Sequence, residues 1–238
     1  MKKIISNLLF TTALMIIFAG CADMNDKLDV YLNEGERVYI GKIDSIHTFV
    51  GDKRIKLAFW ASDPRAQKVG FYWYPNNDSM IIDIAPKVDN TYFEAFIGGT
   101  NSTKSIEEGN YTLKIITRDG ARHFSVPFEK IINIYGDKFR SSLTNRVLKT
   151  IAYQATNSNL SLTFSGPTNE KEIGVGIQYT DKLGAAQLLI LPNSMITSAA
   201  VVVPNVNKTL PVSYRTMFLP EPLAIDTFYT TSKLITIP

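Results

Sequence analysis

The sequence predicts an all-β chain built of two β-sandwiches in tandem behind an export signal. Apolar residues recur at every second position over most of the chain, and one layout of strands and turns occurs twice. An apolar N-terminal stretch also ends at the single cysteine, Cys21. Alternation with a period of two is typical of strands that bury one face. We expect sandwiches at residues 36–135 and 150–238, joined by residues 136–149.

Residues 1–20 are predicted to be a processing segment. Lys2 and Lys3 precede the almost wholly apolar stretch Ile4–Phe18, and the small residues Ala19 and Gly20 follow it. A positive start, a core of about 7–15 apolar residues and a small-residue end are typical of a secretory signal. The signal is therefore expected to be absent from the mature protein.

Cys21 is the predicted lipid attachment point. The run Phe18-Ala19-Gly20-Cys21 resembles the bacterial lipobox, whose cysteine becomes the acylated N-terminus. The alternative is an ordinary signal peptide with a cysteine nearby by chance. Residues 21–35 are polar and acidic and are expected to form a lipid-anchored tether. Because Cys21 is the only cysteine, no disulfide or thiolate metal site is expected within one mature chain.

The charge balance argues against nucleic acid as a partner. The chain has 25 Lys and Arg against 22 Asp and Glu, and loss of Lys2 and Lys3 with the signal leaves 23 against 22. A nearly neutral chain lacks the basic excess that binds nucleic acid. The membrane is the expected partner, through the lipid.

Strand-like runs alternate with turn clusters in the first half. Ile55, Leu57 and Phe59 occupy alternate positions, as do Val69, Phe71 and Trp73 in the next run. The turn-like stretch Ala61-Ser62-Asp63-Pro64 separates the two runs. Short alternating strands at this spacing are typical of an antiparallel sandwich. A short apolar pattern with helical spacing occurs only near Ser141–Leu148.

The same layout recurs in the second half of the chain. Leu160-x-Leu162-x-Phe164 repeats Ile55-x-Leu57-x-Phe59, and Tyr214 takes the place of Tyr111. The offset of about 103–105 residues matches the length of one immunoglobulin-like domain. The repeat therefore predicts two sandwiches of the same kind.

The first unit resembles a fibronectin type III domain. The stretch Glu108-Gly109-Asn110-Tyr111-Thr112-Leu113 resembles the tyrosine corner of such domains. The resemblance implies that the phenol of Tyr111 bonds to backbone a few residues upstream.

Four further stretches resemble a family of Bacteroidetes lipoproteins, domain-of-unknown-function family 4998. They are Tyr31–Glu36 with Tyr39–Lys42, Ser62–Arg65, Tyr135–Arg146, and Leu219–Pro222 with Ile225–Tyr229. The resemblance implies an outer-membrane or cell-surface lipoprotein that occurs with glycan-uptake proteins. Many members continue into a discoidin-like carbohydrate-binding domain, which the sequence up to Pro238 does not contain.

No motif indicates catalysis. His47 and His123 are the only imidazoles, and neither lies in a recognisable motif with a nucleophile. Glu107 and Glu108 are adjacent in a predicted turn, where both can face water. No cluster has metal-ligand spacing. We expect a protein that is not an enzyme and has no cofactor and no metal.

Exposed aromatic residues are the candidate ligand contacts. If Val69, Phe71 and Trp73 face the core, the neighbouring Tyr72 and Tyr74 face outward. Trp60 is one residue out of phase with the buried positions of its own strand. Trp60, Tyr72 and Tyr74 are therefore the candidate stacking surface for a sugar or a partner. The alternative, which scattered surface aromatics favour, is that Trp60 covers the rim of its own sandwich and the tyrosines lie under a neighbouring loop.

The joint is expected to be rigid. A free linker would be rich in Gly, Ser or Pro, whereas this one contains Phe139 and Leu143. The stiff stretch Leu219-Pro220-Glu221-Pro222 should approach from the second sandwich. We expect Phe139 or Leu143 to pack near Pro220 and Pro222. A ligand-binding role for these prolines is the alternative.

These features predict an exported, lipid-anchored outer-membrane protein without catalytic activity, exposed at the cell surface. Its expected role is as an accessory in glycan capture, with a polysaccharide or a glycan-uptake protein as its partner. The alternative is a structural or adhesion module that positions a partner protein away from the membrane.

Replacing the predicted lipid attachment residue tests the predicted membrane location. Cys21→Ala removes the only thiol that can be acylated, so the protein should move from the membrane fraction to the soluble periplasm or the medium. Fractionation and metabolic labelling with a palmitate analogue measure this. Label that persists in the variant would contradict the prediction.

Overall fold

A computed structural model describes residues 38–84 and 92–238 of the chain. The predicted signal at 1–20, the attachment point Cys21 and the tether at 21–35 lie outside the described residues. Within the described residues, no helix is both long and apolar enough to cross a membrane. Strands account for most of the described structure, so the predicted all-β class is confirmed.

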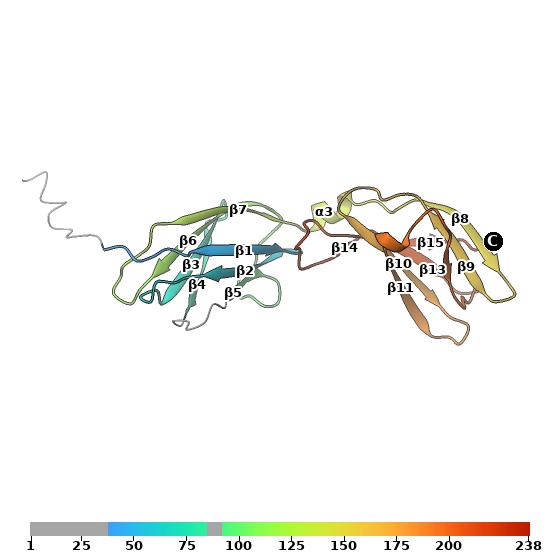
Figure 1. Cartoon of the computed structure of the whole chain (residues 1–238), viewed down its shortest axis with the longest axis horizontal. Coiled ribbons are helices and arrows are strands. Elements are labelled where there is room, and N and C mark those ends of the chain that lie inside the picture. The colour runs from blue at the N-terminus through green and yellow to red at the C-terminus, as the bar shows by residue number, and fades with distance from the viewer. Residues whose placement is uncertain (1–37, 85–91) are drawn as a thin grey trace, which may run out of the picture. The chain divides into compact units, whose positions relative to one another are not determined.

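Among the described residues, seven strands form the first sandwich (Figure 1). One sheet has the order β1-β2-β5 and the other the order β4-β3-β6-β7, with all neighbours antiparallel. The strands are β1 (Ser45–Val50), β2 (Arg54–Trp60), β3 (Lys68–Tyr74), β4 (Asp78–Asp83), β5 (Phe93–Gly98), β6 (Gly109–Arg118) and β7 (Phe128–Ile134).

The second sandwich repeats this arrangement. One sheet has the order β12-β9-β8, and the other the order β11-β10-β13-β14, with β15 also paired to β13. The elements are β8 (Leu148–Gln154), β9 (Asn159–Phe164), β10 (Glu172–Thr180), β11 (Ala186–Pro192), η1 (Asn193–Met195), β12 (Val201–Val203), β13 (Val212–Phe218), β14 (Phe228–Tyr229) and β15 (Lys233–Ile235). The last strand of the first sandwich, β7, corresponds to the two short pieces β14 and β15.

Each sandwich has its own hydrophobic core. Ile55, Leu57 and Phe59 on β2 are fully buried in the first core, and the equivalent β9 residues are buried in the second. In the first core the ring of Phe59 lies 5.4 Å from that of Phe71 on the facing sheet. In the second, Phe164 lies 5.5 Å from Tyr214. The apolar residues at alternate positions of β2 and β9 both point inward. The repeat in the sequence therefore corresponds to two similar hydrophobic cores.

The tyrosine corner expected of the first unit is present. The Tyr111 hydroxyl donates to the carbonyl of Glu107 at 3.0 Å. Its counterpart Tyr214 bonds differently, because its hydroxyl donates to the carbonyl of Arg146, which precedes β8, at 3.0 Å. A tyrosine at the same position therefore stabilises a local turn in the first sandwich, whereas in the second it bonds to the linker just before β8.

A single short helix, α3 (Asp137–Ser142), lies between the sandwiches among the described residues. The sequence pattern predicted helical structure a few residues later, near Ser141–Leu148, and that position is wrong. Helix α3 begins after Gly136, where Glu108 satisfies the first helical N–H groups, as described below. Residues 143–147 are not helical, and β8 starts at Leu148.

The two cores predict a matched pair of mutational effects. Phe59→Ala and Phe164→Ala should each lower the free energy of unfolding by about 3–5 kcal/mol, the usual range for a buried phenylalanine. Trp60→Ala should cost much less, because Trp60 is partly exposed. Chemical denaturation measures all three. A loss at Trp60 as large as at Phe59 would contradict the outward placement of Trp60.

Candidate functional site

The three predicted stacking aromatics do not form one surface. Trp60 lies on β2 in the three-stranded sheet, whereas Tyr72 and Tyr74 lie on β3 in the four-stranded sheet. All three occupy outward positions, because the residues beside them in each strand are buried. The inner faces of the two sheets pack together, so their outward side chains point in opposite directions. The prediction of a single cluster is wrong for Trp60.

Tyr72 is half-buried and already has partners. A Cβ atom on Gly70 would lie 2.9 Å from the Tyr72 ring, so the ring occupies the space that this glycine leaves. Arg118 donates from Nη2 to the Tyr72 hydroxyl, and its guanidinium lies 5.8 Å from the Tyr72 ring centroid and 5.2 Å from that of Phe124. Tyr72 therefore belongs to a packed stack on the sheet, with little surface left for a ligand.

Tyr74 keeps an exposed ring beside an open hollow. It lies opposite Thr112, which in turn lies opposite Ile131 on β7. Tyr74 is 41% exposed and Ile131 is 76% exposed. The hollow has a volume of about 330 Å³ and is lined by Tyr74, Pro75, Asn110, Tyr111, Thr112 and Ile131. None of these side chains carries a formal charge.

A second hollow shares Asn110 with the first. It has a volume of about 590 Å³ and is lined by Glu108, Gly109, Asn110, Asn133, Ile134, Tyr135, Lys138 and Phe139. Asn110 and Asn133 lie directly opposite each other on β6 and β7, and both are exposed. Each amide can donate two hydrogen bonds and accept others. We call the two hollows with these residues the Tyr74 face.

The described residues do not assemble a catalytic group around either histidine. Asp119 accepts hydrogen bonds from the N–H groups of Ala121 and His123, and its Oδ2 lies 2.6 Å from His123 Nδ1. This pair closes the turn between β6 and β7. His47 lies against Tyr92, with ring centroids 5.4 Å apart. Within residues 38–84 and 92–238, no three His, Cys, Asp or Glu side chains gather as metal ligands would.

Helix α3, which contains the predicted joint residue Phe139, lies between the two sandwiches. Helix α3 is held to the first sandwich by Glu108, whose carboxylate accepts from the N–H groups of Lys138 at 2.6 Å and Phe139 at 2.8 Å. Carboxylates stabilise helix starts because they bond to N–H groups that have no partner within the helix. Lys53 adds an ion pair to Asp137 at 2.9 Å.

Phe139 joins the helix to the second sandwich through aromatic rings. Its ring lies 5.0 Å from that of Tyr135 and 5.1 Å from that of Phe228, which is buried on β14. Lys171 places its ammonium group 5.3 Å from the Phe139 ring centroid. The predicted role of Phe139 matches this position, but the aromatic partners are Tyr135 and Phe228 rather than the two prolines.

The other predicted joint residues differ in their burial. Pro220 is buried, Leu143 is half-buried and Pro222 is exposed. Pro222 is exposed between two contacts of its loop with the first sandwich. Before it, Glu221 accepts a hydrogen bond from the Tyr135 hydroxyl at 3.3 Å. After it, Ala224 packs against the first core.

The loop 219–226 reaches the first sandwich by polar contacts. Ile225 N–H donates to the carbonyl of Val50 at 2.8 Å. Asp226 accepts from Arg54 at 2.7 Å and 2.5 Å, in the two-pronged geometry that guanidinium and carboxylate groups favour. Asp226 also accepts from Asp52 N–H at 2.9 Å. A Cβ on Gly51 would lie 2.3 Å from Asp226 Oδ2, so a glycine is needed for this approach.

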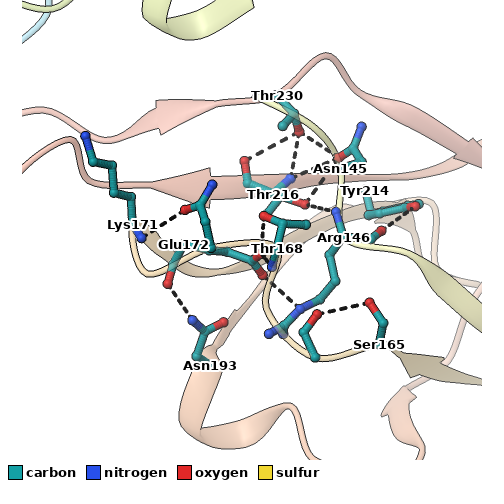
Figure 2. Close-up of polar contacts among 12 residues, drawn as sticks. Asn145, Arg146, Ser165, Thr168, Lys171, Glu172, Asn193, Tyr214, Thr216 and Thr230 are labelled. Atoms are coloured by element: carbon teal, nitrogen blue, oxygen red, sulfur yellow. Dashed lines mark hydrogen bonds and ion pairs between the residues drawn. The ribbon is translucent and has the colours of Figure 1, made fainter. Parts of the chain in front are cut away.

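A buried ion pair fixes the chain where it enters the second sandwich (Figure 2). Arg146 Nε lies 2.8 Å from Glu172 Oε1, and both side chains are almost wholly buried. The other carboxylate oxygen accepts from Thr168 N–H at 2.6 Å and from the Thr168 hydroxyl at 2.8 Å. Among the described residues, Arg146 Nη1 has no hydrogen-bond partner.

Asn145 extends this network to the neighbouring strands. Its Oδ1 accepts from Thr216 N–H at 3.1 Å and from the Thr230 hydroxyl at 2.6 Å. Its Nδ2 donates to the carbonyl of Thr231 at 2.8 Å. We interpret the network as structural, because its partners are strand and loop groups of one sandwich and no hollow opens onto it among those described.

Sequence reasoning missed the charged residues of the joint. Arg54, Glu108 and Asp226 lie in separate parts of the chain, and no local pattern indicates that they meet. The signal that was available is the family resemblance, because the stretches Tyr135–Arg146 and Ile225–Tyr229 both supply joint residues.

Removing the charge of Asp226 should loosen the joint. The hydrogen bonds from Arg54 hold the pKa of Asp226 below its usual value, although burial opposes this. A lowered folded pKa means that the carboxylate stabilises the joint above its unfolded pKa of about 3.9, and that the contribution is lost as pH falls through the folded pKa. Asp226→Asn should therefore broaden the distribution of interdomain distances in small-angle scattering at pH 7.

The unchanged chain should show the same broadening only in acid, below about pH 4. Asp83→Asn is the matched control, since Asp83 is an exposed carboxylate on β4 outside the joint. Distances that stay the same in Asp226→Asn would show that the pair does not hold the sandwiches together.

A protein-family model matches most of this chain. The model of the DUF4998 family, described as a domain of unknown function, matches residues 21–228. A search of curated proteins finds no match.

Similar solved structures include three chicken proteins. A two-domain fibronectin type III segment of tenascin is 10% identical, with 82% of this chain and 99% of that chain covered and a TM-score of 0.33. The FN1–FN3 domains of CNTN1 are 9% identical, with coverages of 83% and 64% and a TM-score of 0.43. The interferon gamma receptor alpha chain is 9% identical, with coverages of 84% and 99% and a TM-score of 0.32. At these scores the likenesses say nothing about function. The family match covers most of the sequence, and the chain therefore belongs to the DUF4998 family.

Proposed function

We propose that this protein is a non-catalytic lipoprotein of the outer membrane, exposed at the cell surface, that captures glycans on the Tyr74 face. The observation that carries the proposal is the combination of an exposed aromatic ring with two opposed amides beside two hollows that share Asn110. Sugar rings have apolar C–H faces that stack on aromatic rings, and hydroxyl groups that bond to amides. The Tyr74 face offers both kinds of contact.

The chemistry of the lining favours an uncharged sugar. The hollow beside Tyr74 has no charged side chain. In the second hollow, both oxygens of Glu108 already accept hydrogen bonds from the start of α3. Its charge is therefore partly satisfied within the protein. The exposed Lys138 is the remaining charged group at that end.

A lipid anchor would place this face at a membrane surface. This membrane location rests on the predicted signal at residues 1–20 and on Cys21, with residues 21–35 as the tether. A membrane-bound glycan-uptake protein is the partner that the family resemblance suggests, since capture at the surface supplies such a protein with substrate.

Tyr74→Ala should weaken polysaccharide binding about fivefold to tenfold, because an aromatic contact contributes about 1 kcal/mol beyond its buried area. The measurement is affinity electrophoresis of residues 22–238 through gels containing neutral glucans, mannans or xylans. Tyr39→Ala is the matched control, since Tyr39 is also exposed but lies before β1 and lines neither hollow. Thermal unfolding confirms that each variant is folded. Equal retardation of the Tyr74→Ala variant and the unchanged chain would contradict the proposed site.

A second candidate function is supported by the joint. Contacts run both from α3 to β14 and from the loop 219–226 to the first sandwich. Such a joint suits a module that holds a partner protein in a set orientation. Partner capture in membranes would then be lost in Asp226→Asn and kept in Tyr74→Ala, the reverse of the pattern expected for a glycan-binding protein.

A further inference from the structure

Strand β11 is an unpaired edge of the second sandwich. It pairs with β10 on one side, and no described strand pairs with its other side. An edge strand presents a row of backbone N–H and C=O groups to which another strand can bond. In Figure 1 the hairpin of β10 and β11 extends away from the rest of its sandwich, which leaves this edge accessible.

The composition of β11 lacks the charged residues that commonly protect an edge. Its sequence Ala-Gln-Leu-Leu-Ile-Leu-Pro has no charged side chain. The equivalent edge of the first sandwich, β4, begins at Asp78 and ends at Asp83, which form ion pairs with Lys104 and Lys68. Charged residues on an edge oppose pairing with another chain. Edge β4 therefore carries charged side chains that β11 lacks.

Two exposed apolar side chains of this edge lie on either side of Leu189. Leu188 and Ile190 are 51% and 45% exposed. In a copy of the strand paired antiparallel about Leu189, each Leu188 lies opposite Ile190, so apolar side chains face one another across the contact.

We propose that β11 pairs with β11 of a second copy of this chain, antiparallel, with a twofold axis at Leu189. A twofold contact joins the same patch on both subunits, so residue i meets residue j and residue j meets residue i. Leu188 then meets Ile190 of the other copy on the outer face. No charge within either β11 opposes the pairing.

The inner face of the edge supports the same arrangement. Leu189 is half-buried and Leu191 is buried on that face. Pairing continues the sheet β11-β10-β13 across the axis and brings the two Leu189 side chains together. Because a single pair of strands buries little area, the dimer should be weak, with a dissociation constant on the order of 10–100 µM.

Cysteine cross-linking tests the position of the axis. Residues 22–238 include every described residue and no cysteine. With Leu189→Cys, the two thiols face each other across the axis, where opposed Cβ atoms are about 4.5–5.5 Å apart and a disulfide can form. With the control Gln187→Cys, the thiols are offset by four residues, about 13 Å along the strands. The Leu189→Cys chain should cross-link at least about tenfold faster, since bridging needs Cα atoms within about 7 Å.

Sedimentation velocity tests the association without a cross-link. The unchanged chain should approach dimer as its concentration rises to about 500 µM, several times the expected dissociation constant. Leu188→Lys should remain a monomer, whereas Leu234→Lys, an exposed change on β15 of the same sandwich, should behave like the unchanged chain. Thermal unfolding checks that both variants are folded. A monomer at every concentration, equal cross-linking of the two cysteine variants, or pairing only with added peptides of other sequence would overturn the proposal.

Discussion

The alternation of side chains along a strand is the constraint on which the rest of this structure depends. Each sheet can bury only one face against its partner sheet, so every strand divides its residues into a core set and an outward set. Phe59 and Phe164 belong to the core set of their sandwiches. Tyr74, on the outward set of β3, owes its exposure to the burial of Trp73 beside it. The proposed glycan contact is therefore a consequence of the core register.

The position of the linker at the second sandwich depends on a buried ion pair, Arg146 and Glu172, whose members would each be unfavourable to bury without the other. Moving Arg146 and Glu172 out of water costs several kcal/mol for each ion, and their attraction repays this only with additional hydrogen bonds. Thr168 supplies such bonds to Glu172. An apolar pair could be as stable, but it would not require one position of the incoming chain. We interpret the ion pair as fixing where the linker enters the second sandwich, so that Phe139 meets Phe228.

The sequence was sufficient for the features that depend on local periodicity. The buried positions of β2 and β9, the outward position of Trp60 and the bond from Tyr111 all follow from alternation or from a short motif. The face formed by Tyr74, Asn110 and Asn133 needed the pairing of β3, β6 and β7, which periodicity does not determine. The pair of Arg54 and Asp226 joins residues far apart in the chain. Position along the chain alone could not indicate that contact.

Both sandwiches bury apolar residues on their inward faces but differ in their outward residues, and this difference separates their proposed roles. On β3 the outward set includes Tyr72 and Tyr74, whereas on β10 it includes Gly176 and Gln178. Gly176 carries no side chain, and the nearest side-chain atoms to its missing Cβ belong to Ile190 and Leu188 on β11. Leu188 and Ile190 thus form an exposed apolar surface at the β11 edge of the second sandwich. A ligand that stacks on rings fits the first sandwich, and a strand that extends a sheet fits the second. Because the two surfaces lie on different sandwiches, a change at Tyr74 should leave self-association unaffected, and a change at Leu188 should leave glycan binding by the single chain unaffected.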